Sequence, residues 1–115
     1  MQTKMEYRKG ILFIRITGSL IRKNINKFES DVLPVILKQG IKYVVLNLEN
    51  LDQIDNYGID SLSNLYEIIY RNNGRSSLCN INSKIKERIK NSNLNNFYFN
   101  TNNELTALEL FKLWV

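Results

Sequence analysis

Three aspartates, Asp52, Asp55 and Asp60, lie close together in the sequence and are the first residues whose chemistry needs an explanation. Paired carboxylates can act as general acid and base. However, no phosphate-cradling glycine loop accompanies them, and the chain contains no histidine, the commonest general base and metal ligand. Its single cysteine, Cys79, cannot complete a zinc site of the usual kind. We therefore expect a protein that is not an enzyme and that has no cofactor and no metal site.

The same segment is better suited to recognition. A strand-like run over residues 43–48 leads through an acidic loop, residues 49–54, into a helix that Asp55 can cap. Unpaired backbone amides and the positive end of the helix dipole face solvent at such a junction. We expect residues 55–61 to form an exposed docking surface. The alternative is that Asp55 only caps the helix and Gly58 only eases the turn.

The hydrophobic pattern predicts the elements that position this segment. Strand-like runs at residues 5–8 and 11–17 flank Lys9-Gly10 and predict an opening hairpin, with Gly18 ending the second strand. Apolar residues at helical spacing predict helices that begin after Asn24, Asp55, Ser83 and Thr101 or Asn102. Gly40 and Gly74 are predicted stops, and Pro34 predicts a bend. The remaining strands are predicted at residues 43–48, 76–81 and 97–99.

Strands that alternate with helices require parallel pairing, while the hairpin adds an antiparallel pair. The prediction is an α/β fold with a mixed sheet of four to five strands and about four helices. The chain's 115 residues fit one domain, 1–115, with one modest core. In the last helices, Ile85, Ile89 and Leu94 are expected to point inward, as are Leu105, Leu108 and Phe111.

Composition restricts the partners and the compartment. The net charge of +5 permits acidic partners, but the basic residues are scattered and no aromatic-interleaved basic stripe is present, so no nucleic acid is expected. No apolar run approaches the roughly 18 residues that cross a bilayer. The polar N-terminus lacks the apolar centre of a secretory signal, and we expect a cytoplasmic monomer or weak dimer without a membrane span. Cys79 is interpreted as a small buried hydrophobe.

Residues 46–51 (LNLENL) and 54–59 (IDNYGI) resemble the signature of the STAS domain, in which a buried strand leads to Asp-Ser-Ser-Gly-Leu at a helix start. Residues 14–20 (IRITGSL) resemble the second strand of the family and its Gly-x-Leu. Gly74 with residues 77–79, and then residues 83–94, 97–99 and 103–108, follow its remaining elements in order. The resemblance implies a STAS fold and the anti-sigma factor antagonist function of the stand-alone members. Those proteins bind an anti-sigma factor that is also a serine kinase, and phosphorylation of the second motif serine breaks the complex.

This sequence departs from that pattern at the residue that is phosphorylated. Tyr57 occupies the position of the acceptor serine, Asn56 the preceding one, and Ile21 a position where the family commonly has aspartate. We predict that Tyr57 is a constitutive aromatic anchor, because tyrosine is enriched among interface hot spots. A partly buried loop tyrosine is the alternative. The predicted partner-binding residues are Ile21, Arg22, Asp55, Asn56, Tyr57, Gly58, Asp60 and Ser61.

Two further features allow more than one interpretation. Ser61 lies one helical turn beyond Tyr57, so it is a weak candidate for a relocated phosphoacceptor, and an ordinary exposed helix serine is the alternative. Four basic residues could contact an acidic partner, although a solvated helix face is the favoured interpretation: Lys84, Lys86, Arg88 and Lys90. The alternative function is a STAS subunit of a larger signalling or lipid-transport assembly.

Overall fold

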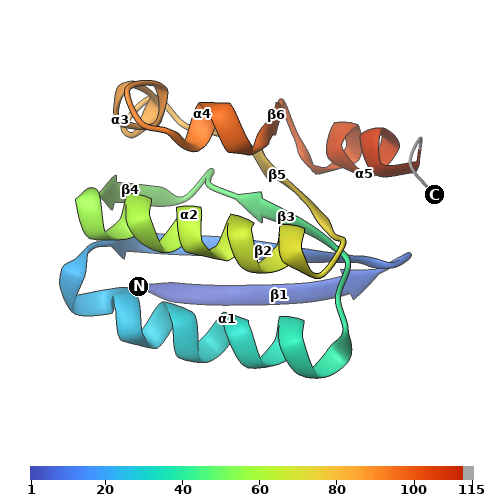
Figure 1. The fold of residues 1–115 in the computed structure, drawn as a ribbon. Helices are drawn as coiled ribbons and strands as arrows, with labels where there is room; N and C mark the ends of the chain where they lie inside the picture. The colour runs from blue at the N-terminus through green and yellow to red at the C-terminus, as the bar shows by residue number, and fades with distance from the viewer. Residues whose placement is uncertain (113–115) are drawn as a thin grey trace.

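The computed structural model describes residues 1–112, so the last three residues of the domain predicted over residues 1–115 lie outside it. Figure 1 shows one mixed sheet with helices packed against it. Six strands lie within the described part: β1 (Gln2–Arg8), β2 (Ile11–Leu20), β3 (Tyr43–Asn47), β4 (Leu51–Ile54), β5 (Arg75–Cys79) and β6 (Phe99–Thr101). The helices are the 3-10 helix η1 (Arg22–Asn24), α1 (Ile25–Gln39), α2 (Asn56–Arg71), α3 (Lys86–Lys90), α4 (Leu94–Phe97) and α5 (Glu104–Lys112).

The strand order confirms the predicted mixed sheet. Strands pair in the order β1-β2-β3-β5-β6, and β4 pairs separately with β2. The pair β1 and β2 is antiparallel, joined by Lys9 and Gly10 at φ angles of 54° and 83°, as the hairpin prediction requires. All the other pairs are parallel. The described residues contain more strands and helices than predicted, but the architecture is the same.

One strand was predicted as a loop. Residues 51–54 form β4, of which Leu51 and Ile54 are buried and the two residues between them are exposed, so no hydrophobic alternation marks it. The predicted end of the preceding strand is wrong for the same reason. Gly18 lies inside β2 and does not end it. Gly18 has a φ of 98°, and the register of β2 against β4 shifts between Gly18 and Ser19. The glycine thus lets β2 leave β3 and continue along β4 to Leu20.

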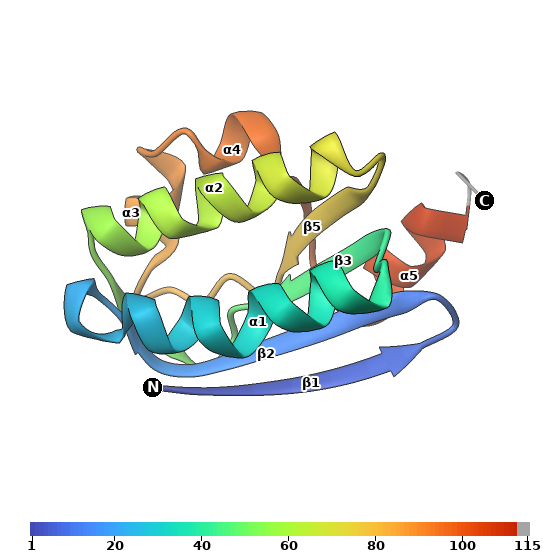
Figure 2. The same cartoon turned by 60° about the horizontal axis from the view of Figure 1, so that its bottom comes forward.

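Helices α1 to α4 pack on one face of the sheet, and α5 covers part of the other face (Figures 1 and 2). Alternate residues of β2 face opposite sides, since side chains alternate along a strand. Leu12 and Ile14 belong to the main core with α1 and α2, while Phe13 packs with Cys79 and with Phe111 of α5. Cys79 is fully buried, as predicted, and burial raises the pKa of its thiol to about 12.

The helix boundaries agree with several of the predicted signals. Gly40 ends α1 in the left-handed conformation, with a φ of 61°. Asn24 precedes α1, but its side chain donates to the backbone oxygen of Ser19 instead of capping the helix. The helix runs through Pro34 from Ile25 to Gln39. Helix α2 ends at Arg71, before the predicted stop at Gly74.

The C-terminal third differs most from the predictions. Ser83 lies in a turn, and the expected single helix is divided into α3 and α4, although Ile85, Ile89 and Leu94 are all buried as predicted. The last strand is Phe99–Thr101, two residues later than expected, because pairing with β5 decides its position. Asn103 caps α5, where its Oδ1 accepts from Thr106 N at 2.8 Å, in place of Thr101 or Asn102. Leu105 is 64% exposed, which corrects the inward prediction, whereas Phe111 is buried.

An ion pair fixes α5 to the sheet. Glu104 accepts from Arg15 of β2 through both carboxylate oxygens, at 2.8 Å from Nε and 2.8 Å from Nη2. Asn47 of β3 donates to the same carboxylate at 2.8 Å. These hydrogen bonds, above all those from Arg15, lower the pKa of Glu104 below its usual 4.5. The ionised carboxylate therefore stabilises the fold, and the stabilisation is lost as the pH falls below that value.

We expect Glu104→Gln to lower the free energy of unfolding by about 1–2 kcal/mol at neutral pH, since bidentate contacts to a charged group are strong but Arg15 is partly exposed. The difference from the unaltered protein should shrink as the pH falls from about 5 to about 3, because Glu104 then takes up a proton. Urea unfolding across this range measures both effects. Glu109→Gln, an exposed glutamate of the same helix, is the control. Equal unfolding midpoints for Glu104→Gln and the unaltered protein at neutral pH would contradict the prediction.

Candidate functional site

The ends of β2 and β4 meet beside the start of α2. Leu20 and Ile54 are neighbours in the parallel pair β2 and β4. The backbone N–H of Asp55 donates to the carbonyl oxygen of Leu20 at 3.4 Å. The strand that the sequence did not predict therefore brings residues 21–22 against residues 55–60, and we call these two segments together the tip.

Asp55 connects the two segments of the tip. Its Oδ1 accepts from Gly58 N at 2.9 Å, which is the predicted N-cap, and its Oδ2 accepts from Arg22 N at 3.0 Å. Partial burial raises the pKa of this carboxyl, but the backbone N–H groups of Gly58 and Arg22 together bring it below its usual value. One ionised side chain thus holds both α2 and η1 in place.

Gly58 is required by close packing, although not by its backbone conformation. A Cβ atom at this position would lie 2.2 Å from the carbonyl oxygen of Leu20 and 2.7 Å from Cγ1 of Ile54. No side chain fits between α2 and the end of β2. The first turn of α2 therefore packs directly on the end of β2.

Tyr57 is the most prominent side chain of the tip. It is 51% exposed, and the guanidinium of Arg22 lies over its ring at 5.2 Å from the centroid. Asp60 is exposed and Ile21 is half-buried. The tyrosine is thus an accessible ring with a cation on one side, and it lies in the first turn of α2 instead of in a loop.

Two residues that were not among the predicted partner-binding residues form hydrogen bonds to the tip and to the loop before β4. Arg88 of α3 donates through Nη2 to Oδ1 of Asn56. Asn82 donates through Nδ2 to the carbonyl oxygens of Leu48, Glu49 and Leu51, at 2.7–2.9 Å, and so fixes the loop that leads into β4. Neither residue belongs to a recognisable motif. The only signal was the basic row of residues 84–90, whose members are all exposed as predicted on the solvated face.

Two of the three aspartates have structural partners instead of forming a catalytic carboxylate pair. Asp55 is occupied by capping, and Asp52 forms an ion pair with Lys84 at 3.1 Å. Within residues 1–112, no group of three histidine, cysteine or carboxylate side chains could hold a metal ion. No helix in that range is both long and apolar enough to span a bilayer.

Ser61 corrects one prediction. It is only 3% exposed, and its hydroxyl donates to Oε2 of Glu29 at 2.8 Å. The expectation of an exposed serine, available to a partner or a kinase, is therefore wrong. The side chain turns toward α1 because α2 packs along that helix, a contact that spacing from Tyr57 alone does not reveal.

We expect Ser61→Asp, which imitates the charge of a phosphate, to lower the free energy of unfolding by about 2 kcal/mol. The new carboxylate would lie buried against that of Glu29 and would lose the hydrogen bond that the hydroxyl donates. Thermal or urea unfolding measures the effect, and Asn64→Asp at an exposed position of α2 serves as the control. If both variants unfold at the same midpoint as the unaltered protein, Ser61 is accessible after all. Mass spectrometry of the protein recovered from cells should show no phosphate on Ser61.

Comparison with known proteins identifies the family of this chain. The sequence matches the STAS domain family over residues 2–107. An anti-sigma F factor antagonist of Paenibacillus polymyxa is 26% identical over 113 residues, which cover 96% of this chain and 97% of the relative.

Two solved structures show the same fold. That of an anti-sigma factor antagonist from Mycobacterium paratuberculosis matches with a TM-score of 0.86 at 15% identity, covering 96% of this chain and 93% of that one. The Bacillus cell fate determinant SpoIIAA in its phosphorylated form matches with a TM-score of 0.72 at 17% identity, covering 96% and 99%. The predicted STAS fold is confirmed, and because the family match extends over nearly the whole sequence, this chain belongs to the STAS domain family.

Proposed function

We propose that this protein is an anti-sigma factor antagonist that binds an anti-sigma factor, or a related serine kinase, through the tip. The single observation that supports this most strongly is the exposed Tyr57 on a helical turn that packs directly on the sheet. A large side chain that is held in place before binding loses little conformational entropy in an interface. The name of the Paenibacillus polymyxa relative supports the kind of partner.

The proposal includes the absence of the usual serine switch. In the family resemblance, the phosphate is placed at the position that Tyr57 occupies here, and the preceding position is Asn56. Neither residue is a serine: Asn56 has no hydroxyl, and the only hydroxyl of Tyr57 is the phenolic one at the far end of its ring, which is not the acceptor of a serine kinase. Ser61 is shielded by Glu29. The complex would therefore be regulated by the amounts of the two proteins, both in the cytoplasm, and not by phosphorylation of the tip.

Affinity purification from native lysate, followed by mass spectrometry, tests the identity of the partner. We expect an anti-sigma factor or serine kinase to co-purify with the unaltered chain and to be lost with a variant that lacks the Tyr57 side chain. Recovery of membrane transporter subunits, or of a large signalling scaffold, in place of an anti-sigma factor would instead support the alternative of a STAS subunit in a larger assembly. Reconstitution from the two purified proteins then separates direct from indirect binding.

A further inference from the structure

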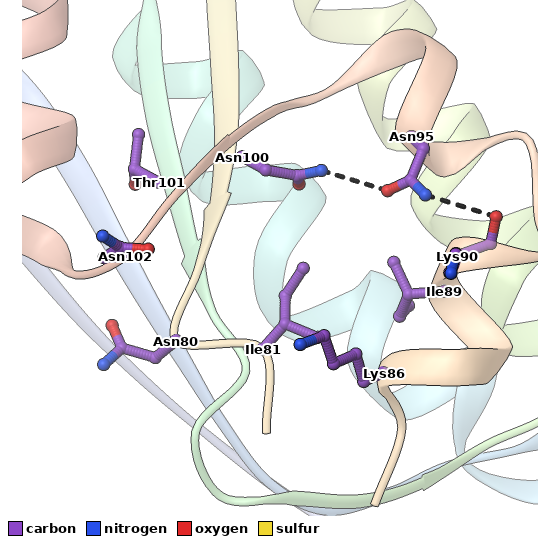
Figure 3. A pocket seen from close by; sticks show the side chains of 9 residues that line it. All are labelled: Asn80, Ile81, Lys86, Ile89, Lys90, Asn95, Asn100, Thr101 and Asn102. Atoms are coloured by element: carbon purple, nitrogen blue, oxygen red, sulfur yellow. Dashed lines mark hydrogen bonds between the residues drawn. The ribbon is translucent and has the colours of Figure 1, made fainter. Parts of the chain in front are cut away.

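A cavity with a mixed polar and apolar wall lies beyond the carboxyl ends of β5 and β6, apart from the tip. Figure 3 shows it between the residues that follow these two strands and the short helices α3 and α4. Its volume is about 340 Å³.

The charged side chains that line this cavity are all positive. Lys86 and Lys90 of α3 line it, and no aspartate or glutamate is among the described residues of its wall. The two lysines are one helical turn apart, so their like charges repel each other. Neither ammonium group forms an ion pair with a carboxylate in residues 1–112. An anionic group in the cavity would relieve this repulsion.

The rest of the wall carries amides. Asn100 donates to Oδ1 of Asn95 at 3.0 Å, and Asn95 donates to the carbonyl oxygen of Lys90 at 3.2 Å (Figure 3). Asn80 is different, because its Oδ1 is buried and accepts no hydrogen bond from any described residue. It also has a left-handed φ of 55°, directly after β5. A buried acceptor without a donor is costly, and either a bound water or a hydroxyl group of a ligand would satisfy it.

We propose that this cavity binds a small phosphorylated sugar or polyol. The phosphate would lie between the ammonium groups of Lys86 and Lys90, and a hydroxyl group would donate to Oδ1 of Asn80. The apolar side chains of Ile81 and Ile89 supply a surface for the C–H groups of the sugar. This ligand class follows from the wall itself, which combines two lysines without an ion pair, several amides and an apolar surface that includes Ile81 and Ile89.

Titration of ribose 5-phosphate into the purified chain tests the proposal by calorimetry and by backbone amide NMR. We expect saturable binding, with shifts of the amide signals of residues 80–102. Ribose and inorganic phosphate should each bind at least about ten-fold more weakly, because each lacks one half of the recognised groups. The double variant Lys86→Ala with Lys90→Ala should also lose about ten-fold or more. Lys38→Ala, which removes an exposed lysine of α1, should leave the affinity unchanged.

Asn80→Gly provides a second test that does not depend on charge. Glycine tolerates the left-handed φ, so the fold should be kept while the orphan acceptor is removed. We expect weaker binding of ribose 5-phosphate without a lower melting temperature. The proposal is overturned if no saturable binding occurs, if Lys38→Ala weakens binding as much as the double variant does, or if Asn80→Gly binds as tightly as the unaltered protein.

Discussion

Gly58→Ala is expected to lower the free energy of unfolding by about 3 kcal/mol or more, because overpacking against backbone cannot be relieved by a change of rotamer. The added methyl group would lie 2.2 Å from the carbonyl oxygen of Leu20. Helix α2 must then move away from the end of β2, which also breaks the hydrogen bonds through which Asp55 joins the two segments of the tip. Urea unfolding measures the loss.

Gly40→Ala is the matched control for this prediction. Gly40 follows the last residue of α1, and nothing lies within 4 Å of a Cβ atom built there. Its φ of 61° alone should cost about 1 kcal/mol on substitution. If the two variants lose equal stability, close packing of Gly58 against β2 is not what holds the tip in place.

Tyr57→Ala is expected to weaken binding of the anti-sigma factor about 30-fold or more, which corresponds to a hot-spot loss of about 2 kcal/mol. The free energy of unfolding should change by less than about 0.5 kcal/mol, since the ring is half exposed and lies beside the guanidinium of Arg22 at the surface. Titration calorimetry with the purified partner measures the affinity, and urea unfolding measures the stability.

Tyr70→Ala provides the comparison within the same helix. Tyr70 is 54% exposed, close to the 51% of Tyr57, and it also lies beside an arginine, with Arg75 at 5.6 Å from its ring centroid. It lies at the opposite end of α2 from the tip. Its removal should leave the affinity unchanged. Equal losses for the two tyrosines would mean that the partner does not distinguish the tip from the rest of α2.

The sequence predicted those parts of the fold in which local pattern and tertiary packing agree. The hairpin at Lys9-Gly10 and the cap at Asp55 follow from residues that lie next to one another in the chain. Strand β4 could not be predicted in this way, because its pairing with the end of β2 is a long-range contact and its short pattern lacks alternation. The asparagine-rich segment of residues 91–103 likewise has no periodicity that would separate α4 from β6.

The same holds for the tip: features set by neighbouring residues were predicted, and features set by long-range contacts were not. The motif located Asp55 and Tyr57 correctly, since the start of a helix is set by nearby residues. It misplaced Ser61, whose environment is decided by Glu29 on another helix. It also gave no indication that Arg88 would reach Asn56, because α3 was not distinguished from a longer surface helix.

Hydrogen exchange of the chain, alone and in complex with the purified anti-sigma factor, tests most directly whether the tip is the docking surface. The account predicts slower exchange of backbone amides in residues 21–22 and 55–60 when the partner is bound, with little change along α1. Slower exchange confined to the outer face of α1, where Leu37 is 55% exposed, with residues 55–60 unaffected, would contradict it.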